Sequence, residues 1–103
     1  MSVLMQFAMF PTDKGASVSK EVSSIIEMLR ASGVSYKLGS MGTTVETDTF
    51  EKALEILKKS YELLGNSSDR VYASINFDIR KGEVNRMERK IDSVESKIGE
   101  VNK

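Results

Sequence analysis

The sequence contains no histidine, no cysteine and no tryptophan, and it has a single proline. Without histidine the chain has no Ser-His-Asp triad, no histidine general base and no histidine ligand for a metal. Without cysteine it has no disulfide, no thiolate nucleophile and no cysteine-type zinc site. Enzymatic chemistry is left to carboxylates, lysine, tyrosine, serine and threonine. These absences predict a protein that is not an enzyme, with no catalytic residues.

An excess of charge of either sign is also missing. The 103 residues include 15 basic and 15 acidic side chains, so the net charge at pH 7 is zero. Nucleic-acid binding depends largely on neutralising phosphates, so this balance argues against a nucleic-acid partner. The apolar share of 40% is that of a soluble globular protein. With no repeat and no linker, we expect one domain over residues 1–103.

Long apolar runs are missing as well. Residues 1–10 are apolar, but no lysine or arginine precedes them and Pro11 follows at once. This run is too short for a membrane span, which needs about 20 residues. We therefore expect no membrane partner and, by default, a cytoplasmic protein.

The apolar side chains that are present follow two kinds of spacing. Alternation predicts strands over residues 3–10, 34–39, 43–48 and 70–80. Spacings of three and four predict helices over about 17–32, 49–64 and 85–98. Ser17 or Ser19 can cap the first helix, and Asp48 or Thr49 the second. Gly33 is free to end the first helix in a left-handed conformation.

This order of elements is β-α-β-β-α-β, followed by a helix. Right-handed crossovers fold such an order into a four-stranded antiparallel sheet with two helices on one face. We therefore predict an α+β protein with a ferredoxin-like βαββαβ sandwich, spatial strand order 4-1-3-2, and an additional C-terminal helix.

The other face of this sheet stays open, and alternation predicts what it carries. On the last strand the apolar residues point toward the helices, so Ser74 and Asn76 point away from them. Val45 points inward, which leaves Thr44 and Glu46 outward. Gln6 is placed outward because an unpaired buried amide costs a few kcal/mol. The expected open face therefore carries polar groups beside exposed apolar ones, with surplus negative charge: Gln6, Thr44, Glu46, Ser74 and Asn76, with Leu4, Phe10 and Tyr72 around them.

Such a surface suits a small, planar, nitrogen-rich and cationic ligand. Amides and carboxylates can bind the edge of the ring, while aromatic side chains cover its face. The same positions would also serve as solvated sheet residues or as contacts between subunits, and the pattern leaves these alternatives open.

Several segments together resemble a known family. These are Gln6-Phe-Ala-Met-Phe-Pro11, Ser17-Val-Ser19, Ser32-Gly33-Val-Ser-Tyr36, Met41-Gly-Thr-Thr-Val-Glu46 and Arg70-Val71. In this order and spacing they are similar to the small thiamine-binding (YkoF-like) proteins. The resemblance implies a ferredoxin-like subunit, assembled as a dimer of dimers, that binds thiamine or its hydroxymethylpyrimidine portion without catalysis.

The resemblance also implies a set of ligand-binding residues. Glu46 and Thr43 or Thr44 match the family motif directly, whereas Gln6, Ser40 and Asn76 are inferred from their positions. A carboxyl group would pair with a ring nitrogen of the aminopyrimidine, and an amide or hydroxyl would accept from its exocyclic amine. Thiamine would be a ligand here, and no cofactor and no metal are expected.

Other hypotheses remain. The alternative function is an oligomeric structural or regulatory interaction domain with no ligand, a homo-oligomer that uses its open face for assembly. The third helix carries an apolar stripe of coiled-coil spacing, which would pack on its own sheet edge or on a neighbouring subunit. Its basic residues, among them Arg86 and Arg89, are predicted to be solvated. An oxygen-only metal or acid-base pair at Glu46 and Asp48, an RNA-binding sheet and an acylphosphatase-type site have weaker sequence support.

Overall fold

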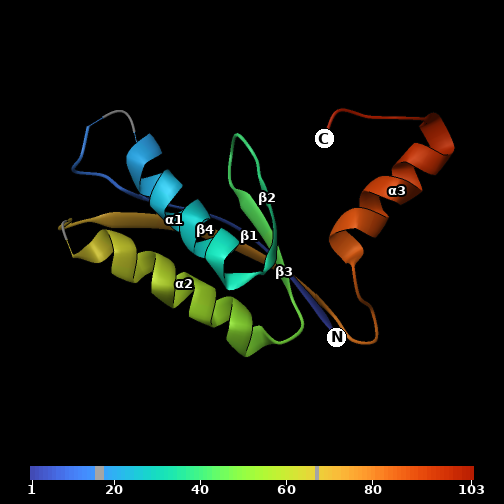
Figure 1. The fold of residues 1–103 in the computed structure, drawn as a ribbon, viewed down its shortest axis with the longest axis horizontal. Helices are drawn as coiled ribbons and strands as arrows, with labels where there is room; N and C mark the ends of the chain where they lie inside the picture. Colours follow the sequence, from blue (N-terminus) through green and yellow to red (C-terminus); the bar gives the residue numbers. More distant parts are fainter. Residues whose placement is uncertain (16–17, 67) are drawn as a thin grey trace.

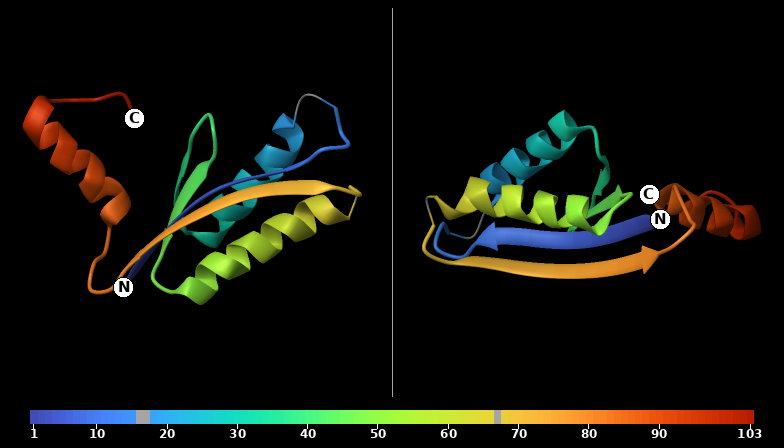
Figure 2. Two further views of the ribbon diagram at one scale, coloured as in Figure 1. Left: turned by 180° about the vertical axis from the view of Figure 1, so that it is seen from behind. Right: turned by 90° about the horizontal axis from the view of Figure 1, so that it is seen from below.

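The four strands form one antiparallel sheet in the order β2-β3-β1-β4, which confirms the predicted ferredoxin-like topology. The computed structural model describes residues 1–15, 18–66 and 68–103. Helices α1 and α2 cover one side of the sheet, and the other side is bare along most of β1 and β4 (Figures 1 and 2). The elements are β1 (Ser2–Pro11), α1 (Ser19–Ser32), β2 (Ser35–Leu38), β3 (Thr43–Thr47), α2 (Phe50–Gly65), β4 (Val71–Arg80) and α3 (Arg86–Ile98).

Strand β1 lies in the centre of the sheet, paired with both β3 and β4. Met5 is opposite Val45 on one side and Phe77 on the other. Directly opposed residues share a face of the sheet, so these three point toward the helices together. Met5 and Val45 have no exposed surface. The predicted alternation is therefore confirmed on β1, β3 and β4.

The two covering helices differ in how they begin. Helix α2 has Thr49 at its N-cap, where the hydroxyl oxygen accepts a hydrogen bond from the Lys52 amide at 3.2 Å, as predicted. Helix α1 has Val18 at its N-cap and no side-chain cap, so the prediction for Ser19 was wrong. Ser17 lies outside the described residues. Gly33 ends α1 in the left-handed conformation, with φ of 76°.

The buried face of α2 is rotated from the predicted one. The helical spacing of Phe50, Ala53, Leu54, Leu57, Tyr61 and Leu64 predicts that these side chains form the apolar stripe of α2. Ala53, Ile56 and Leu64 are buried, whereas Leu54 and Tyr61 are exposed. The sequence stripe is wide enough to support either orientation. Helix α2 packs against β1 and α1, and the side that these elements bury is the one that carries Ala53 and Ile56.

Strand β4 is an edge strand that the helices cover only in part. Phe77 packs against Phe50 of α2, with ring centroids 5.1 Å apart. Even so, Ile75, Phe77 and Ile79 keep between 38% and 46% of their surface exposed. The side chains predicted as core on β4 thus form an apolar strip that this chain does not bury.

Helix α3 stands apart from the two covering helices (Figure 1). It contacts β1 and β3 at its beginning, where Arg86 and Met87 are buried. Farther along, Val94 and Ile98 of its apolar stripe are exposed. Among the described residues, the structure therefore does not support packing of this stripe along the chain's own sheet edge.

The Thr49 cap gives a direct test of how α2 is anchored. We expect Thr49→Ala to lower the free energy of unfolding by about 1 kcal/mol, because an amide of the first turn loses its acceptor. Thr49→Ser keeps the hydroxyl and should retain most of the stability. Urea denaturation of both variants is the measurement, and equal losses would show that the hydroxyl does not cap the helix.

Candidate functional site

Three of the predicted ligand residues form one row across the open face. Gln6 is opposite Thr44 of β3 on one side and Asn76 of β4 on the other. Gln6 and Asn76 are exposed, and Thr44 is half-buried. At the far end of the same face Phe10 and Tyr72 form an aromatic pair with centroids 5.4 Å apart. The sheet therefore brings an amide, a hydroxyl and a second amide together, as predicted.

Glu46 lies two positions along β3 from this row, opposite Leu4, but its carboxylate is engaged within the chain. Its Oε2 accepts from the Ser2 hydroxyl at 2.6 Å and from the Arg86 amide at 2.9 Å. Its Oε1 accepts from the Met87 amide at 3.1 Å. Those two amides are at the N-terminus of α3, so Glu46 caps this helix from a neighbouring strand.

The surplus negative charge expected on the open face is neutralised by α3. Oδ2 of Asp78 lies 3.0 Å from Nη1 of Arg86 and 3.0 Å from Nζ of Lys90. Arg86 is 5% exposed, so its predicted place on the solvated face of α3 was wrong. Asp48 forms an ion pair with Lys52 at 2.8 Å. The acidic side chains therefore serve first to hold the chain's own cations.

These contacts also determine the acidity of the carboxyl groups. Burial of Glu46 acts to raise its pKa, but hydrogen bonds from Ser2 and from the Met87 and Arg86 amides outweigh burial and lower the pKa. The pKa of Asp78 is lowered by the hydrogen bonds from Lys90 and Arg86. Both groups are therefore held as carboxylates.

The other two predicted residues, Ser40 and Thr43, lie away from this row at a separate hollow. It measures about 360 Å³ and opens between the start of α1 and the β2–β3 hairpin, and we call it the hairpin hollow. Thr43 is opposite Phe7 on the helix side of the sheet and is 6% exposed. Apolar side chains make up most of the wall, including Phe7, Met9, Val18, Val22, Ile25, Leu38 and Met41.

The hairpin is held close to β1 at the edge of this hollow. Gly39 and Gly42 close the turn, with the Gly39 amide donating to the Gly42 carbonyl at 2.9 Å. A Cβ atom on Gly42 would lie 3.1 Å from the Phe7 carbonyl oxygen. A side chain at this position would push the hairpin outward, so the glycine keeps Ser40 and Thr43 beside the apolar wall.

The larger hollows are different in character. One of about 450 Å³, between the end of α1 and the start of α2, is lined by five charged side chains: Glu46 of β3, Asp48 before α2, and Lys52, Glu55 and Lys59 of α2. Its lysines are paired with Asp48 and Glu55. Within the described ranges, no group of three or more acidic side chains could hold a metal ion. The wall of the hairpin hollow is instead mostly apolar, and the described residues in it include Ser40 and Thr43 but no charged side chain.

The structure thus divides the six predicted residues between two places. Gln6, Thr44 and Asn76 share the open face, with Glu46 at its end, and Ser40 and Thr43 share the hairpin hollow. The role of Arg86 was missed, because a basic residue at the start of an amphipathic helix has the same sequence signature whether it is buried or solvated. The hollow was missed because it is made by segments that are distant in sequence.

The fold is that of a small ferredoxin-like domain, with a polar row on the open side of its sheet and an apolar hollow on the helix side. The profile of the family described as "Thiamine-binding protein" matches residues 5–95. The chain therefore belongs to the thiamine-binding protein family.

Individual relatives support this assignment. A UPF0045 protein of Methanocaldococcus jannaschii is 34% identical over 92 residues, covering 89% of this chain and 91% of the relative. A UPF0045 protein of Mycobacterium bovis is 32% identical over 95 residues, covering 92% and 93%.

Solved structures share the fold. The crystal structure of a hypothetical protein from Methanocaldococcus jannaschii has a TM-score of 0.80 at 33% identity, covering 90% of this chain and 95% of that one. A putative thiamine biosynthesis/salvage protein from Thermotoga maritima has a TM-score of 0.77 at 21% identity, covering 91% and 99%. The second likeness is one of fold alone.

The lowered pKa values of Glu46 and Asp78 predict that α3 separates from the sheet when these carboxylates are protonated at low pH. The unfolded-state pKa values are about 3.9 for Asp and about 4.3 for Glu, and those of Asp78 and Glu46 in the folded protein are lower. Their contribution is therefore fully present above the unfolded values and is lost as the pH falls through the folded values. Amide hydrogen exchange in residues 87–98, followed from pH 6 downward, should show α3 loosening before the sheet does, provided rates are corrected for intrinsic pH dependence.

Substitution of single carboxyls at neutral pH provides the control. Glu46→Gln should speed exchange in α3, because the capping carboxylate loses its charge. Asp48→Asn should leave α3 unchanged, since Asp48 pairs with Lys52 instead. Equal behaviour of the two variants would contradict the assignment of Glu46 as the cap of α3.

Proposed function

We propose that this protein binds thiamine or its hydroxymethylpyrimidine portion without transforming it, and that the pyrimidine ring enters the hairpin hollow. Membership of the thiamine-binding protein family supports the ligand class. The observation that carries the location is the lining of this hollow. It contains Val18, from one segment that resembles the family, and Ser40–Thr43, which overlap another.

The chemistry of the hollow agrees with this ligand. Its volume of about 360 Å³ is within the range of small-molecule sites. Apolar walls can cover the faces of a flat ring, while the hydroxyls of Ser40 and Thr43 can bind its polar edge. None of the described side chains that line it is ionisable near neutral pH. The hollow therefore offers recognition without a general acid or base, which supports binding rather than catalysis.

A neighbouring copy of the chain is proposed to bind at β4, on the sheet edge opposite the hairpin hollow. β4 is ten residues long and lies at the edge of the sheet, so one side of its backbone is unpaired within the sheet. The apolar strip Ile75, Phe77 and Ile79 runs along the same strand. Edges of this kind pair readily with another chain. We propose that two copies meet at β4 and that pairs of such dimers assemble further, in the cytoplasm.

A second candidate function rests on the same strip. An oligomeric structural or regulatory domain with no ligand would also bury β4, and it would need neither Ser40 nor Thr43. The two functions differ in what the hollow does, and this difference can be measured.

Calorimetric titration with thiamine and with hydroxymethylpyrimidine tests the proposed function. We expect saturable binding, and at 100 times the dissociation constant the ligand should stabilise the fold by about 2.7 kcal/mol. Thr43→Val keeps the shape of the side chain and removes one hydrogen bond, so binding should weaken by roughly tenfold.

The control is placed on the other side of the sheet. Asn76→Ala removes an exposed amide of the open face and should change the affinity by less than about twofold. A larger effect of Asn76→Ala than of Thr43→Val would move the site to the open face. Absence of binding to the unaltered protein at millimolar ligand would leave the oligomeric domain as the function.

The β4 interface is tested by light scattering. Ile79→Lys should lower the particle mass, because a buried lysine at the interface would be unpaired. Leu38→Lys alters an even more exposed apolar residue on the opposite edge strand and should leave the mass unchanged. A monomeric unaltered protein, or equal effects of the two variants, would contradict assembly through β4.

A further inference from the structure

Arg86 is a buried cation with a site built around it. Its Nε donates to the Ser2 hydroxyl at 3.0 Å, and its Nη2 donates to the Ser2 carbonyl at 3.0 Å and to the Asp78 carbonyl. Its Nη1 lies 3.0 Å from the Asp78 carboxylate. Every nitrogen of the guanidinium thus has an oxygen partner, and the residue is 5% exposed.

The partners come from separate strands that the sheet brings together. Ser2 is at the start of β1 and Asp78 is near the end of β4, and both point to the open face. Ser2 is oriented in turn by Glu46 of β3, to which its hydroxyl donates. A buried guanidinium is tolerated only when its fork of donors is matched in this way. The sheet thus provides the oxygen atoms that accept the hydrogen bonds, and α3 provides the guanidinium that donates them.

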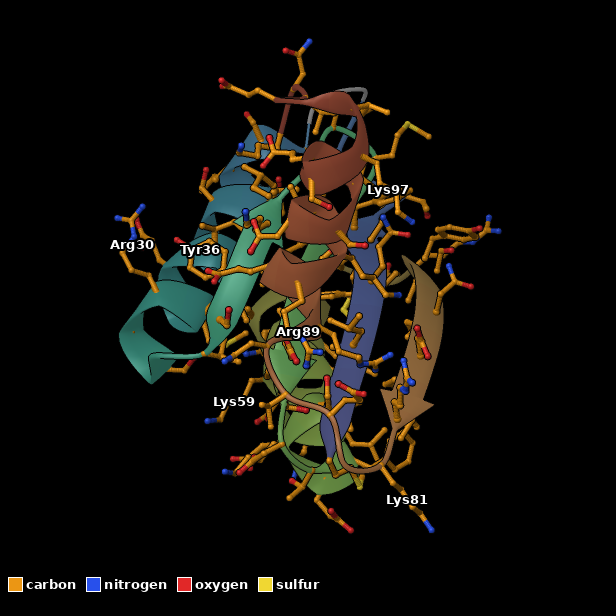
Figure 3. All side chains as sticks on the ribbon, turned by 90° about the vertical axis from the view of Figure 1, so that its right-hand side faces the viewer. Arg30, Tyr36, Lys59, Lys81, Arg89 and Lys97 are labelled. Atoms are coloured by element: carbon orange, nitrogen blue, oxygen red, sulfur yellow. The ribbon has the colours of Figure 1, made fainter. Side chains whose placement is uncertain are left out.

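Beyond its first turn, α3 is joined to the sheet by the exposed ion pair of Lys90 with Asp78. Met87, beside Arg86, is buried, whereas Val94 and Ile98 are exposed. From the side of α3 the helix stands in front of β3 and β1, with β2 on one side and β4 on the other (Figure 3). In the connection before it, Gly82 and Asn85 both have positive φ values, 79° and 54°. The anchored end of α3 is therefore its first turn.

We propose that Ser2 and Asp78, supported by Glu46, form a binding site for a planar cation of the guanidinium class, and that Arg86 is its tethered occupant. Docking of α3 then depends on this side chain, together with the Glu46 cap and the Lys90–Asp78 ion pair. When the site is vacant, α3 comes away from the sheet as a unit. Its release uncovers Leu4, which is 8% exposed and lies on the open side between Glu46 and Asp78, the two carboxylates that bind Arg86. Arg86 thereby controls access to this end of the open face.

The proposed site can be tested by removing the Arg86 side chain and adding a small guanidinium compound in solution. In the full-length Arg86→Ala variant, amide exchange in residues 87–98 should speed up by at least about tenfold, because the hydrogen bonds and the ion pair of a buried guanidinium are lost. Methylguanidinium, followed by NMR shifts of Ser2 and Asp78, should bind this variant with a millimolar dissociation constant. Methylammonium has the same charge without the planar fork, and it should bind at least about tenfold more weakly.

Arg89→Ala is the matched control, since Arg89 is on the same helix turn but pairs with Glu83 at the surface, 2.7 Å away. It should change neither exchange in α3 nor methylguanidinium binding. Equal exchange in the two variants, or equal binding of the two cations to Arg86→Ala, would overturn the proposal. If Arg86→Ala does not fold, Arg86→Lys replaces it: faster exchange confined to α3 supports the proposal, and unchanged exchange overturns it.

Discussion

The antiparallel register of β1 between β3 and β4 is the constraint on which the other features depend. It places Met5 against Val45 and Phe77 on the covered side, and Gln6 against Thr44 and Asn76 on the open side. A slip of one residue would exchange the two faces, moving apolar side chains into water and an amide into the core. The free-energy cost of exposing apolar side chains and burying an amide favours this one register over its neighbours. The hairpin hollow and the anchor of α3 are both built on positions that this register fixes.

The topology and the faces of the sheet could be predicted because they follow from local patterns. Strict alternation on β4 and the inward Val45 decide the faces, and helix placement then decides the strand order. The buried side of α2 could not be predicted, since its stripe includes both Leu54 and Leu64 and only tertiary packing distinguishes them. The burial of Arg86 could not be predicted for a related reason, because its hydrogen-bond acceptors lie on strands that are distant in sequence.

The candidate site was predicted in part for the same physical reason. Alternation brings Gln6 and Asn76 to one row, since they lie on regular strands. Thr43 is at the first position of β3, where the same alternation turns it to the helix side. Ser40 lies in the turn, which has no periodicity to indicate a direction. Glu46 was predicted to bind the ligand, but the sequence could not show that its carboxylate caps α3 of the same chain.

The molecule has three distinct regions outside its core. The helix side holds a hydroxyl-bearing apolar hollow, the open side holds a flat polar row, and the end of the sheet holds α3 through Arg86. The chain belongs to the thiamine-binding protein family, and we propose the hollow as the place where the pyrimidine binds.

A crystal structure of the protein with hydroxymethylpyrimidine bound tests this account most directly. The account predicts the ring between α1 and the β2–β3 hairpin, with its polar edge toward Ser40 and Thr43. A ring lying on the open face against Gln6 and Asn76 would contradict it.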